Sequence, residues 1–525
     1  MSDPFGFGEP GQGATSAPRS RREARESAAA AGEPVRPAAD SRRDRPEPGE
    51  RGGIAGVIAK HPRAWLATAL ATAFVLLGTG AVFAGIAVGG SDQPTVTAPI
   101  DPADQVAERD VPGEIPPATD LRTCTVTQFA SDPRLMTLRG EVVDTGSGEV
   151  LFDRGGANPA RPASAVKLIT AAAALNALGP DHRFSTAVFE GTAPGQIVLV
   201  GGGDATLNSR ESGENVYKGA PTLNLLAQLA LQGWVEVNGD EPITSLVLDA
   251  TLWNPSDKWD ASWSRSEQTR GYLSEVTALQ VDGDRADPTK LVSPRSTDPV
   301  ARAGAAFVRA LERAGLDNGP DAPPITVTLG TNTSPTKLGE VQSQPLSTLV
   351  VQMLLASDGT LAEMMARATS IKMGLAGASG TIGQAVTGAL SPLQLDTDNL
   401  TVVDGSGFSA NNAVAPDFFV RLLELSREGT NQLSYVYNGL SEAGKTGTMV
   451  DRFRGSSAVA RDAVVAKTGK IATAQTLTGI VVAKDGTVLS FALYAIGEGI
   501  TDDAKAALDD LVAGFYSCGA NLSNN

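Results

Sequence analysis

The sequence predicts a mixed α/β (α+β) fold, because segments with strand character and segments with helix character both recur along its folded part. Residues 141–144 and 149–152 have the pattern of two hairpin strands around a Gly-containing turn. Residues 164–178 form an Ala/Leu-rich stretch typical of a helix. From about residue 185 to 338 the sequence has the pattern of short strands and turns instead. This change in the predicted secondary structure indicates a structural boundary near residue 185.

The rest of the folded chain repeats the mixture of elements. The remaining expected elements are a strand at 197–200, a strand at 325–329, a helical region at 346–376, strands at 478–483 and 487–495, and a final helix at 502–516. A folded region that begins near residue 125 and continues to about residue 518 therefore contains helices and strands throughout.

The first 124 residues read as a tail, an anchor and a linker. Residues 1–62 are rich in Gly, Pro, Ala, Ser and Arg without apolar periodicity, which predicts a disordered tail. Within 63–90, the 26 residues of 65–90 carry no charge, a length that suits one transmembrane helix. Basic residues precede this stretch, so the N-terminus is expected in the cytoplasm, although cleavage near Ala84 is an alternative. The Pro-rich, acidic residues 91–124 predict an extended linker.

Charge and histidine content exclude several classes of function. The net charge is −16; residues 1–63 carry 11 Lys/Arg and 9 Asp/Glu, a net of +2, which leaves −18 on the remainder and argues against nucleic acid as a partner. The two histidines are His61 and His182. One histidine in the folded region does not make a zinc site, so no metal and no cofactor is expected. A Ser-His-Asp triad would require His182, which we interpret as structural.

The two cysteines, Cys124 and Cys518, bracket nearly all of the region after the apolar stretch. If this region is exported, an oxidising compartment permits a disulfide between its two ends. Two unpaired thiols are the alternative.

Ser164 and Lys167 carry the strongest chemical signal, at the start of the predicted helix. Residues three apart on a helix project from the same face. Serine needs a neighbouring base to act as a nucleophile, and a desolvated lysine can be neutral and accept its proton. Alone, this spacing is also compatible with an ordinary helix start and an exposed lysine.

A second signal follows at Lys467-Thr468-Gly469, after an apolar strand-like segment. The glycine permits close approach of a substrate backbone, and Thr468 offers a hydroxyl for a carboxylate. Lys445-Thr446-Gly447 is an alternative triplet, but it precedes a charged segment instead of a strand, so Lys467 is preferred.

Five motifs in order resemble the low-molecular-mass class C penicillin-binding proteins, which are D-alanyl-D-alanine carboxypeptidase/endopeptidases. The resemblance extends from about residue 130 to 517, and its motifs are Pro162–Lys167, Gly201–Leu207, Ser357–Glu363, Asp404–Ser409 and Lys467–Gly469. It implies a serine β-lactamase/D,D-peptidase-like transpeptidase fold with an inserted β-rich domain. The implied organisation is a catalytic domain made of two segments, 125–184 and 339–518, with the insert at 185–338 between them and a tail at 519–525.

The resemblance implies a mechanism in which Ser164 is acylated by peptidoglycan stem peptides, Lys167 accepts its proton, and Ser357 relays a proton in a network with Lys467. Thr468, Gly469 and Lys470 are the implied substrate-binding residues, with β-lactams as inhibitors. The backbone N–H groups of Ser164 and Lys470 would form the oxyanion hole.

Two positions depart from the family pattern. The chain has Ser357-Asp358-Gly359 where Ser-x-Asn is expected, so Gly359 replaces the Asn, and Lys470 stands where Ser or Thr is usual. Both changes affect substrate binding, so a degenerate, non-catalytic cell-wall binding or scaffold protein on the same fold is the alternative function. A serine β-lactamase is a weaker third reading, since no deacylating Glu is evident.

The other motifs receive structural interpretations. Gly201–Leu207 predicts a tight turn and not a phosphate loop, Glu363 a solvated or capping carboxylate, and Ser406 a residue without a proton role. The expected location is the cell membrane, with one span and an extracytoplasmic catalytic domain. The sequence indicates neither the oligomeric state nor whether carboxypeptidase or endopeptidase action dominates.

Overall fold

The computed structural model describes residues 122–319 and 323–524, which belong to one compact unit. Among these residues, no helix is both long and apolar enough to cross a bilayer. The expected tail at 1–62, the expected anchor at 63–90 and nearly all of the expected linker lie outside the described residues.

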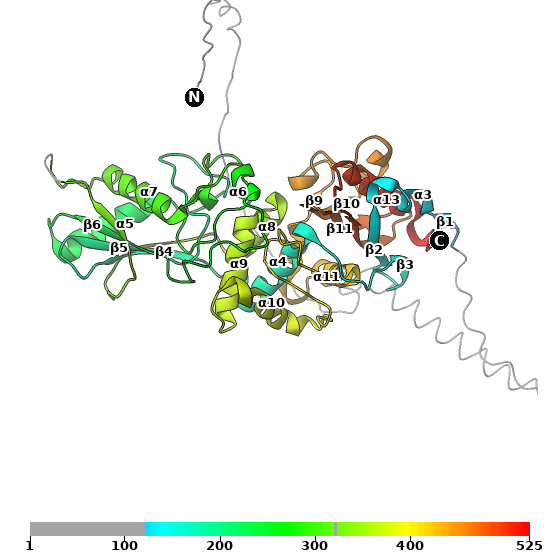
Figure 1. Ribbon diagram of the computed structural model, residues 1–525, viewed down its shortest axis with the longest axis horizontal. Helices are drawn as coiled ribbons and strands as arrows, with labels where there is room; N and C mark the ends of the chain where they lie inside the picture. Colours follow the sequence, from blue (N-terminus) through cyan, green and yellow to red (C-terminus); the bar gives the residue numbers. More distant parts are fainter. Residues whose placement is uncertain (1–121, 320–322, 525) are drawn as a thin grey trace, which may run out of the picture. The chain divides into compact units, whose positions relative to one another are not determined.

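The part of the chain outside the insert contains an antiparallel sheet, whose strands come from the C-terminal part of the sequence (Figure 1). Its strands, in the order β12-β11-β10-β9, are β9 (Ser441–Glu442), β10 (Val464–Ile471), β11 (Ala474–Val482) and β12 (Val488–Ile496). The hairpin of β2 (Thr137–Asp144) and β3 (Val150–Arg154) packs beside β12. A Cβ on Gly140 would lie 2.9 Å from the carbonyl oxygen of Ala492, so this close approach requires glycine.

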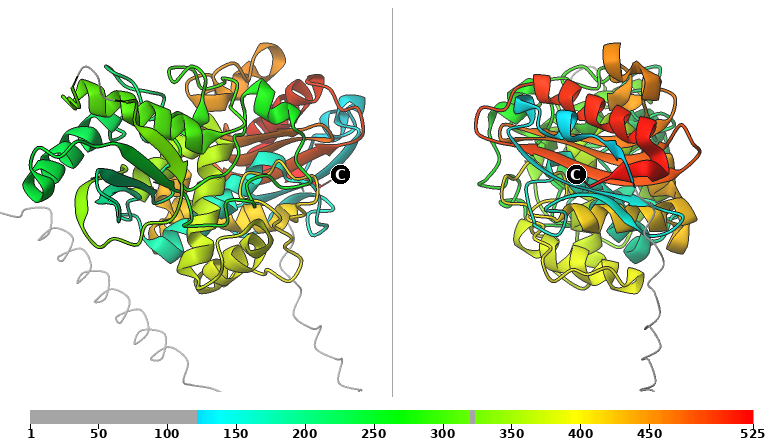
Figure 2. Two further views of the ribbon diagram at one scale, coloured as in Figure 1. Left: turned by 60° about the vertical axis from the view of Figure 1, so that its left-hand side comes forward. Right: turned by 90° about the vertical axis from the view of Figure 1, so that its right-hand side faces the viewer.

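The two faces of this sheet bury different cores, because successive side chains of a strand point to opposite faces. Leu477 and Val481 of β11 pack under α13 (Asp503–Cys518), which crosses the sheet in the right-hand view of Figure 2. Ile480 faces the helical layer instead. That layer contains α4 (Val166–Leu178), α8 (Leu346–Ala356), α9 (Gly359–Lys372), α10 (Ile382–Leu390), α11 (Pro416–Glu428) and α12 (Ser434–Asn438).

Helix α4 lies inside the helical layer, where it contacts α8, α9 and α10. Its residues from Val166 to Leu175 are all buried, including four consecutive alanines, whose small side chains allow neighbouring helices to approach closely. The helix ends at Gly179, which has φ +86°. The helix expected at 164–178 is thus present, except that its first turn, Ala163–Ala165, is a 3₁₀ helix (η2).

The inserted region has its own five-stranded sheet with the order β7-β6-β5-β4-β8. Its elements are β4 (Ser185–Glu190), β5 (Gln196–Gly201), α5 (Leu223–Asn238), β6 (Ser245–Asp249), α6 (Ser266–Arg270), α7 (Pro299–Arg313), β7 (Thr326–Leu329) and β8 (Lys337–Gln342). Strands β5, β6 and β7 are parallel. Parallel strands need crossover connections, and α5 and α7 supply them, so the description of the insert as β-rich was incomplete.

Short elements complete the described chain. They are α3 (Thr127–Ala130), the 3₁₀ helices η1 (Pro133–Leu135), η3 (Asp282–Asp284), η4 (Ser379–Thr381), η5 (Ser391–Leu393), η6 (Thr430–Gln432), η7 (Gly447–Met449), η8 (Gly455–Ala460) and η9 (Gly519–Asn521), and the parallel pair β1 (Cys124–Thr125) and β13 (Leu522–Ser523). Beside this pair, Cys124 and Cys518 form a disulfide with a Cα–Cα distance of 5.4 Å.

The helical region expected at 346–376 is two helices, and the break between them lies at Ser357 and Asp358. Ser357 adopts a left-handed conformation with φ +53°, which ends α8. Asp358 then begins α9 as its N-cap, since its carboxylate accepts a hydrogen bond from the N–H of Leu361 at 3.1 Å. Because this break falls between two buried helices, Ser357 is held in a fixed position.

Candidate active site

Ser164 lies at the beginning of α4, in the tight turn η2, and its side chain is largely buried. The Nζ atom of Lys167 is 3.1 Å from the Ser164 Oγ atom, so the two side chains share one face of the helix as their spacing predicted. The preceding residue, Ala163, has φ +48°, a conformation costly for alanine. Gly407 packs so tightly over this turn that a Cβ would collide with the Ala163 carbonyl oxygen.

A second serine–lysine pair lies beside the first. The Nζ atom of Lys467, on β10, donates to the Ser357 Oγ atom at 2.8 Å and to its neighbour's carbonyl oxygen, that of Thr468, at 2.7 Å. Lys445 is half exposed and forms ion pairs with Glu442 and Asp462 instead. The structure therefore brings Lys467, and not Lys445, to Ser357.

Lys167 and Lys467 are completely buried, which disfavours their charged forms. Burial lowers the pKa of Lys167 to about 8, against the opposing effect of Asp404 and then Glu363. Burial, and then the positive charge of Lys167, lower the pKa of Lys467 well below its ordinary value. A substantial neutral fraction of lysine near pH 8 is what a base that activates a serine requires.

The Ser357 turn is attached to the insert through Asp358. The Asp358 carboxylate accepts hydrogen bonds from Arg285 Nη2 at 2.7 Å and from Tyr217 Oη at 2.8 Å. The ion pair is almost inaccessible, with both side chains 2% exposed. Burial alone would raise the pKa of Asp358, but Arg285 and then Arg295 hold it below its usual range. Removing either partner would leave a buried charge unpaired.

The loop from Asp404 to Ser409 holds Lys167 from the other side. The Ser406 carbonyl oxygen accepts a hydrogen bond from Lys167 Nζ, and the Ser406 N–H donates to Glu363 Oε1 at 2.8 Å. Glu363 is completely buried, so the expectation of a solvated or capping carboxylate was wrong. Burial, and then Asp404, raise the pKa of Glu363 to about 8. The apolar neighbours of Glu363 in α9, Ala362 and Met364, were the signal available in the sequence.

Asp404 organises its own loop and connects it to the insert. Its carboxylate accepts from the N–H groups of Gly407 and Ser409, both at 2.7 Å. It also accepts from Trp263 Nε1 at 2.7 Å and from the side chain of Asn412 at 2.9 Å. Sequence reasoning assigned no role to Trp263, which joins an insert loop directly to the loop from Asp404 to Ser409.

The outer part of the site contains two threonine hydroxyls. Thr468 Oγ1 lies 2.7 Å from Thr448 Oγ1, and both side chains are partly exposed. Gly469 packs against the Ser164 turn, since a Cβ there would lie 3.0 Å from the Ala163 Cβ. Lys470 points to Asp502, with which it forms an exposed ion pair. Thr448 was missed because its triplet, although the more regular-looking of the two, precedes a charged segment instead of a strand and was set aside for that reason.

Other groups occupy the space that a side chain at Gly359 would fill. A Cβ at this position would lie 2.6 Å from the Cε2 atom of Phe408 and 3.2 Å from both Leu273 Cδ1 and the Tyr272 carbonyl oxygen. The Phe408 ring is also 5.3 Å from the Nζ atom of Lys167. The space beside Lys167 that a longer residue 359 would enter thus contains an aromatic ring.

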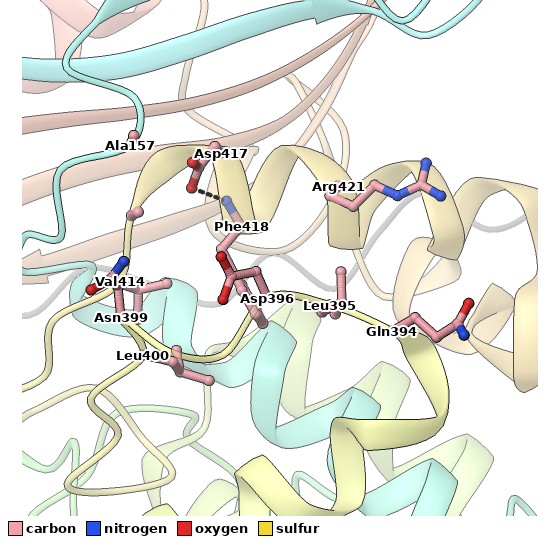
Figure 3. A pocket seen from close by; sticks show the side chains of 11 residues that line it. Ala157, Gln394, Leu395, Asp396, Asn399, Leu400, Val414, Asp417, Phe418 and Arg421 are labelled. Atoms are coloured by element: carbon pink, nitrogen blue, oxygen red, sulfur yellow. Dashed lines mark hydrogen bonds between the residues drawn. The ribbon is translucent and has the colours of Figure 1, made fainter.

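A cavity of about 350 Å³ is separate from the serine–lysine cluster. It lies between the start of α11 and residues 394–400, with Asp396, Asp417 and Arg421 at its polar side (Figure 3). None of Ser164, Lys167, Ser357 and Lys467 lines it, so it plays no part in the chemistry of that cluster.

The remaining features singled out in the sequence lie outside the serine–lysine cluster. His182 stacks edge-on against Phe184, with ring centroids 4.9 Å apart, and lies outside the serine–lysine cluster. Gly203 in the Gly-rich turn packs against Trp253, as a turn of the insert would. Across residues 122–319 and 323–524, no group of three or more His, Cys, Asp and Glu side chains is arranged to hold a metal ion.

Comparison with known proteins finds a matching family and several relatives. Residues 123–293 and 285–515 match the D-Ala-D-Ala carboxypeptidase 3 (S13) family. The chain is 30% identical over 462 residues to carboxypeptidase DacB of Mycolicibacterium smegmatis, covering 86% of this chain and 95% of the relative. It is 29% identical over 455 residues to the D-alanyl-D-alanine carboxypeptidase of an Actinomadura species, covering 71% and 79% of the two chains.

A solved structure shows a similar fold. Penicillin binding protein 4 (dacB) from Haemophilus influenzae superposes with a TM-score of 0.59 at 20% identity, covering 72% of this chain and 95% of that chain. At this level of identity, the likeness concerns the fold alone.

Proposed function

Because the chain belongs to the D-Ala-D-Ala carboxypeptidase 3 (S13) family, as a low-molecular-mass class C penicillin-binding protein, we propose that it hydrolyses peptidoglycan stem peptides. The proposed activity is that of a serine-type D-alanyl-D-alanine carboxypeptidase/endopeptidase that acts through an acyl-Ser164 intermediate. The observation that carries this proposal is the pairing of two serines with two buried lysines in one cluster.

In the acylation step, the Ser164 Oγ atom attacks the carbonyl carbon of the D-Ala-D-Ala bond while its proton moves to the neutral amine of Lys167. The backbone N–H groups of Ser164 and Lys470 stabilise the resulting oxyanion. When the C–N bond breaks, Ser357 gives its proton to the leaving amine and regains one through Lys467. The products are an acyl ester on Ser164 and a free amino acid or peptide.

In deacylation, water replaces the departed amine. Lys167, which again has a free electron pair after proton relay, accepts a proton from this water, and the hydroxide equivalent attacks the ester. Ser164 then regains its proton as the ester bond breaks. The 3.1 Å distance between Lys167 Nζ and Ser164 Oγ supports the use of one base in both steps.

Covalent labelling by a fluorescent penicillin tests this proposal, because a β-lactam carbonyl is attacked by the same serine. The full-length protein is expected to be labelled, and Ser164→Ala is expected to abolish the label. A native protein that stays unlabelled while a labelled family member serves as positive control would refute the acyl-serine mechanism.

A non-catalytic cell-wall binding protein on the same fold is the second candidate, and the absence of a side chain at Gly359 together with Lys470 favours it. This candidate predicts binding of stem peptides without release of D-alanine. Release of D-alanine from a pentapeptide by the native protein, absent in Ser164→Ala, would exclude it.

We also propose that residues 63–90 anchor the protein in the cell membrane, with a cytoplasmic N-terminus and an extracytoplasmic catalytic region. The disulfide between Cys124 and Cys518 supports export, since disulfides persist in oxidising compartments. The full chain should remain in membranes after an alkaline wash and should be cleaved by protease added outside intact spheroplasts. Recovery of the full chain in the soluble fraction would contradict the anchor.

A further inference from the structure

The triplet Lys445-Thr446-Gly447 is a rigid support and not a second catalytic motif. Thr446 Oγ1 accepts a hydrogen bond from the Glu442 N–H at 2.8 Å, which closes the turn after β9. Gly447 has φ +53°, and a Cβ there would collide with the Ser441 hydroxyl and lie 2.6 Å from the Leu355 carbonyl oxygen. The turn is therefore pressed against the end of α8, directly before Ser357.

This support holds the next residue, Thr448, at the mouth of the active site. Its Oγ1 atom is 2.7 Å from Thr468 Oγ1. The carbonyl oxygen of Thr468 accepts a hydrogen bond from Lys467 Nζ at 2.7 Å, and Lys467 in turn donates to Ser357. The two hydroxyls thus adjoin the proton-relay pair while remaining partly exposed.

A pair of hydroxyls has unused hydrogen-bonding capacity. Each hydroxyl has one proton to donate, and in a contact between two hydroxyls only one proton is used. The other proton is available to an acceptor that approaches from outside. A carboxylate has two oxygens with about four acceptor positions, so it can accept this free proton, that of Thr448, and also the proton of Thr468 once Thr468 donates to the ligand instead of to Thr448.

Lys470, which stands where the family usually has Ser or Thr, has no hydroxyl to offer a carboxylate. Its Nζ atom is committed to Asp502, which also pairs with Lys505 and accepts from the amide of Gln475 at 3.1 Å. The second hydroxyl beside Thr468 comes from Thr448, a residue 20 positions earlier in the chain.

We propose that Thr448 is a substrate-binding residue, which forms with Thr468 a two-hydroxyl site for the free carboxylate of a D-alanyl-D-alanine terminus or of a β-lactam. This inference rests on the proposed acylation of Ser164. It assigns recognition of carboxylate-bearing ligands to the residue that follows the first Lys-Thr-Gly triplet, with the triplet as its support.

The test compares a ligand with a carboxylate and the same ligand without one. The second-order rate of acylation is measured on the full-length protein with benzylpenicillin and with its methyl ester. Thr448→Val, which keeps the shape of the side chain and removes the hydroxyl, should slow acylation by the free acid about 10- to 100-fold, the effect of a hydrogen bond to a charged group. Acylation by the ester should change less than about twofold, and Thr448→Ser should restore the rate with the free acid.

Lys445→Ala is the matched control, since its side chain lies in the same turn but forms only exposed ion pairs with Glu442 and Asp462. It should leave the ratio of acid to ester rates unchanged. An equal loss on acid and ester in Thr448→Val, or no loss, would overturn the proposal. If the native protein is acylated by neither ligand, the proposed function fails instead. In that case, the affinities of the protein for N-acetyl-D-alanyl-D-alanine and for its C-terminal amide are measured. If the ratio of these two affinities is the same in the native protein and in Thr448→Val, the proposed role of Thr448 is wrong.

Discussion

Replacing Gly359 by Asn would restore the amide that family members carry, but the structure predicts that this single change is harmful. The new Cβ would lie 2.6 Å from Phe408 Cε2, whereas ordinary carbon contacts begin near 3.5 Å. Leu273 Cδ1 and the Tyr272 carbonyl oxygen, each at 3.2 Å, block retreat in the other directions. The ring of Phe408 must therefore move.

Overpacking of this kind costs about 1–3 kcal/mol of unfolding free energy. The unfolding entropy is about 2.1 cal/mol/K per residue, so for a folded region of roughly 400 residues this cost corresponds to a decrease of about 1–4 °C in Tm. Because Phe408 lies 5.3 Å from Lys167 Nζ, its displacement should also lower the rate of acylation.

A double-mutant cycle gives the decisive measurement. Gly359→Asn, Phe408→Leu and the double variant are compared by thermal unfolding and by the rate of penicillin acylation. Phe408→Leu removes the ring that blocks residue 359, so the double variant should be more stable than the sum of the two single effects predicts, by about 1–2 kcal/mol. Full stability and faster acylation in Gly359→Asn alone would refute the reasoning. Hydrolysis that appears in Gly359→Asn and is absent from the native chain would instead establish the native chain as a degenerate, non-catalytic protein.

Three further predictions follow from the same structure. The acylation rate should rise about tenfold between pH 7 and pH 9, because a pKa of about 8 for Lys167 makes its neutral, proton-accepting fraction increase over this range; a rate that is flat or falls with pH would contradict a lysine base. Lys467→Ala should abolish acylation, while Lys445→Ala, whose ion pairs are exposed, should leave it within about twofold of the native rate, so equal losses would be inconsistent with the assignment. Loss of the disulfide in Cys124→Ser or Cys518→Ser should lower the unfolding free energy by about 2–5 kcal/mol, measured by denaturant unfolding, and an unchanged midpoint would show that the bridge adds no stability.

Several elements were predictable because their signals are local. The helix after Ser164 and the terminal hairpin of β11 and β12 follow from apolar spacing and from a turn at Lys484-Asp485-Gly486. The insert was harder to predict, since helices α5 and α7 join strands of one parallel sheet, and single-strand patterns do not reveal which strands are neighbours.

Glu363 shows why burial of a charged residue escapes sequence reasoning. A glutamate on a helix is usually solvated, so its residue type favoured an exposed side chain. Its burial depends on the loop at Ser406, 43 residues later, whose N–H group compensates the carboxylate. Such a partner is recognised only when both segments are placed in space.

The sequence alone determined the pairing of Ser164 with Lys167, because a separation of three residues on a helix places two side chains together wherever the helix lies. Only the tertiary structure decided which of two lysines reaches Ser357, which threonine joins Thr468 and what fills the space beside Gly359. Those contacts join residues from 20 to more than 100 positions apart. They depend on how the sheet, the helical layer and the insert pack against one another, which local periodicity does not encode.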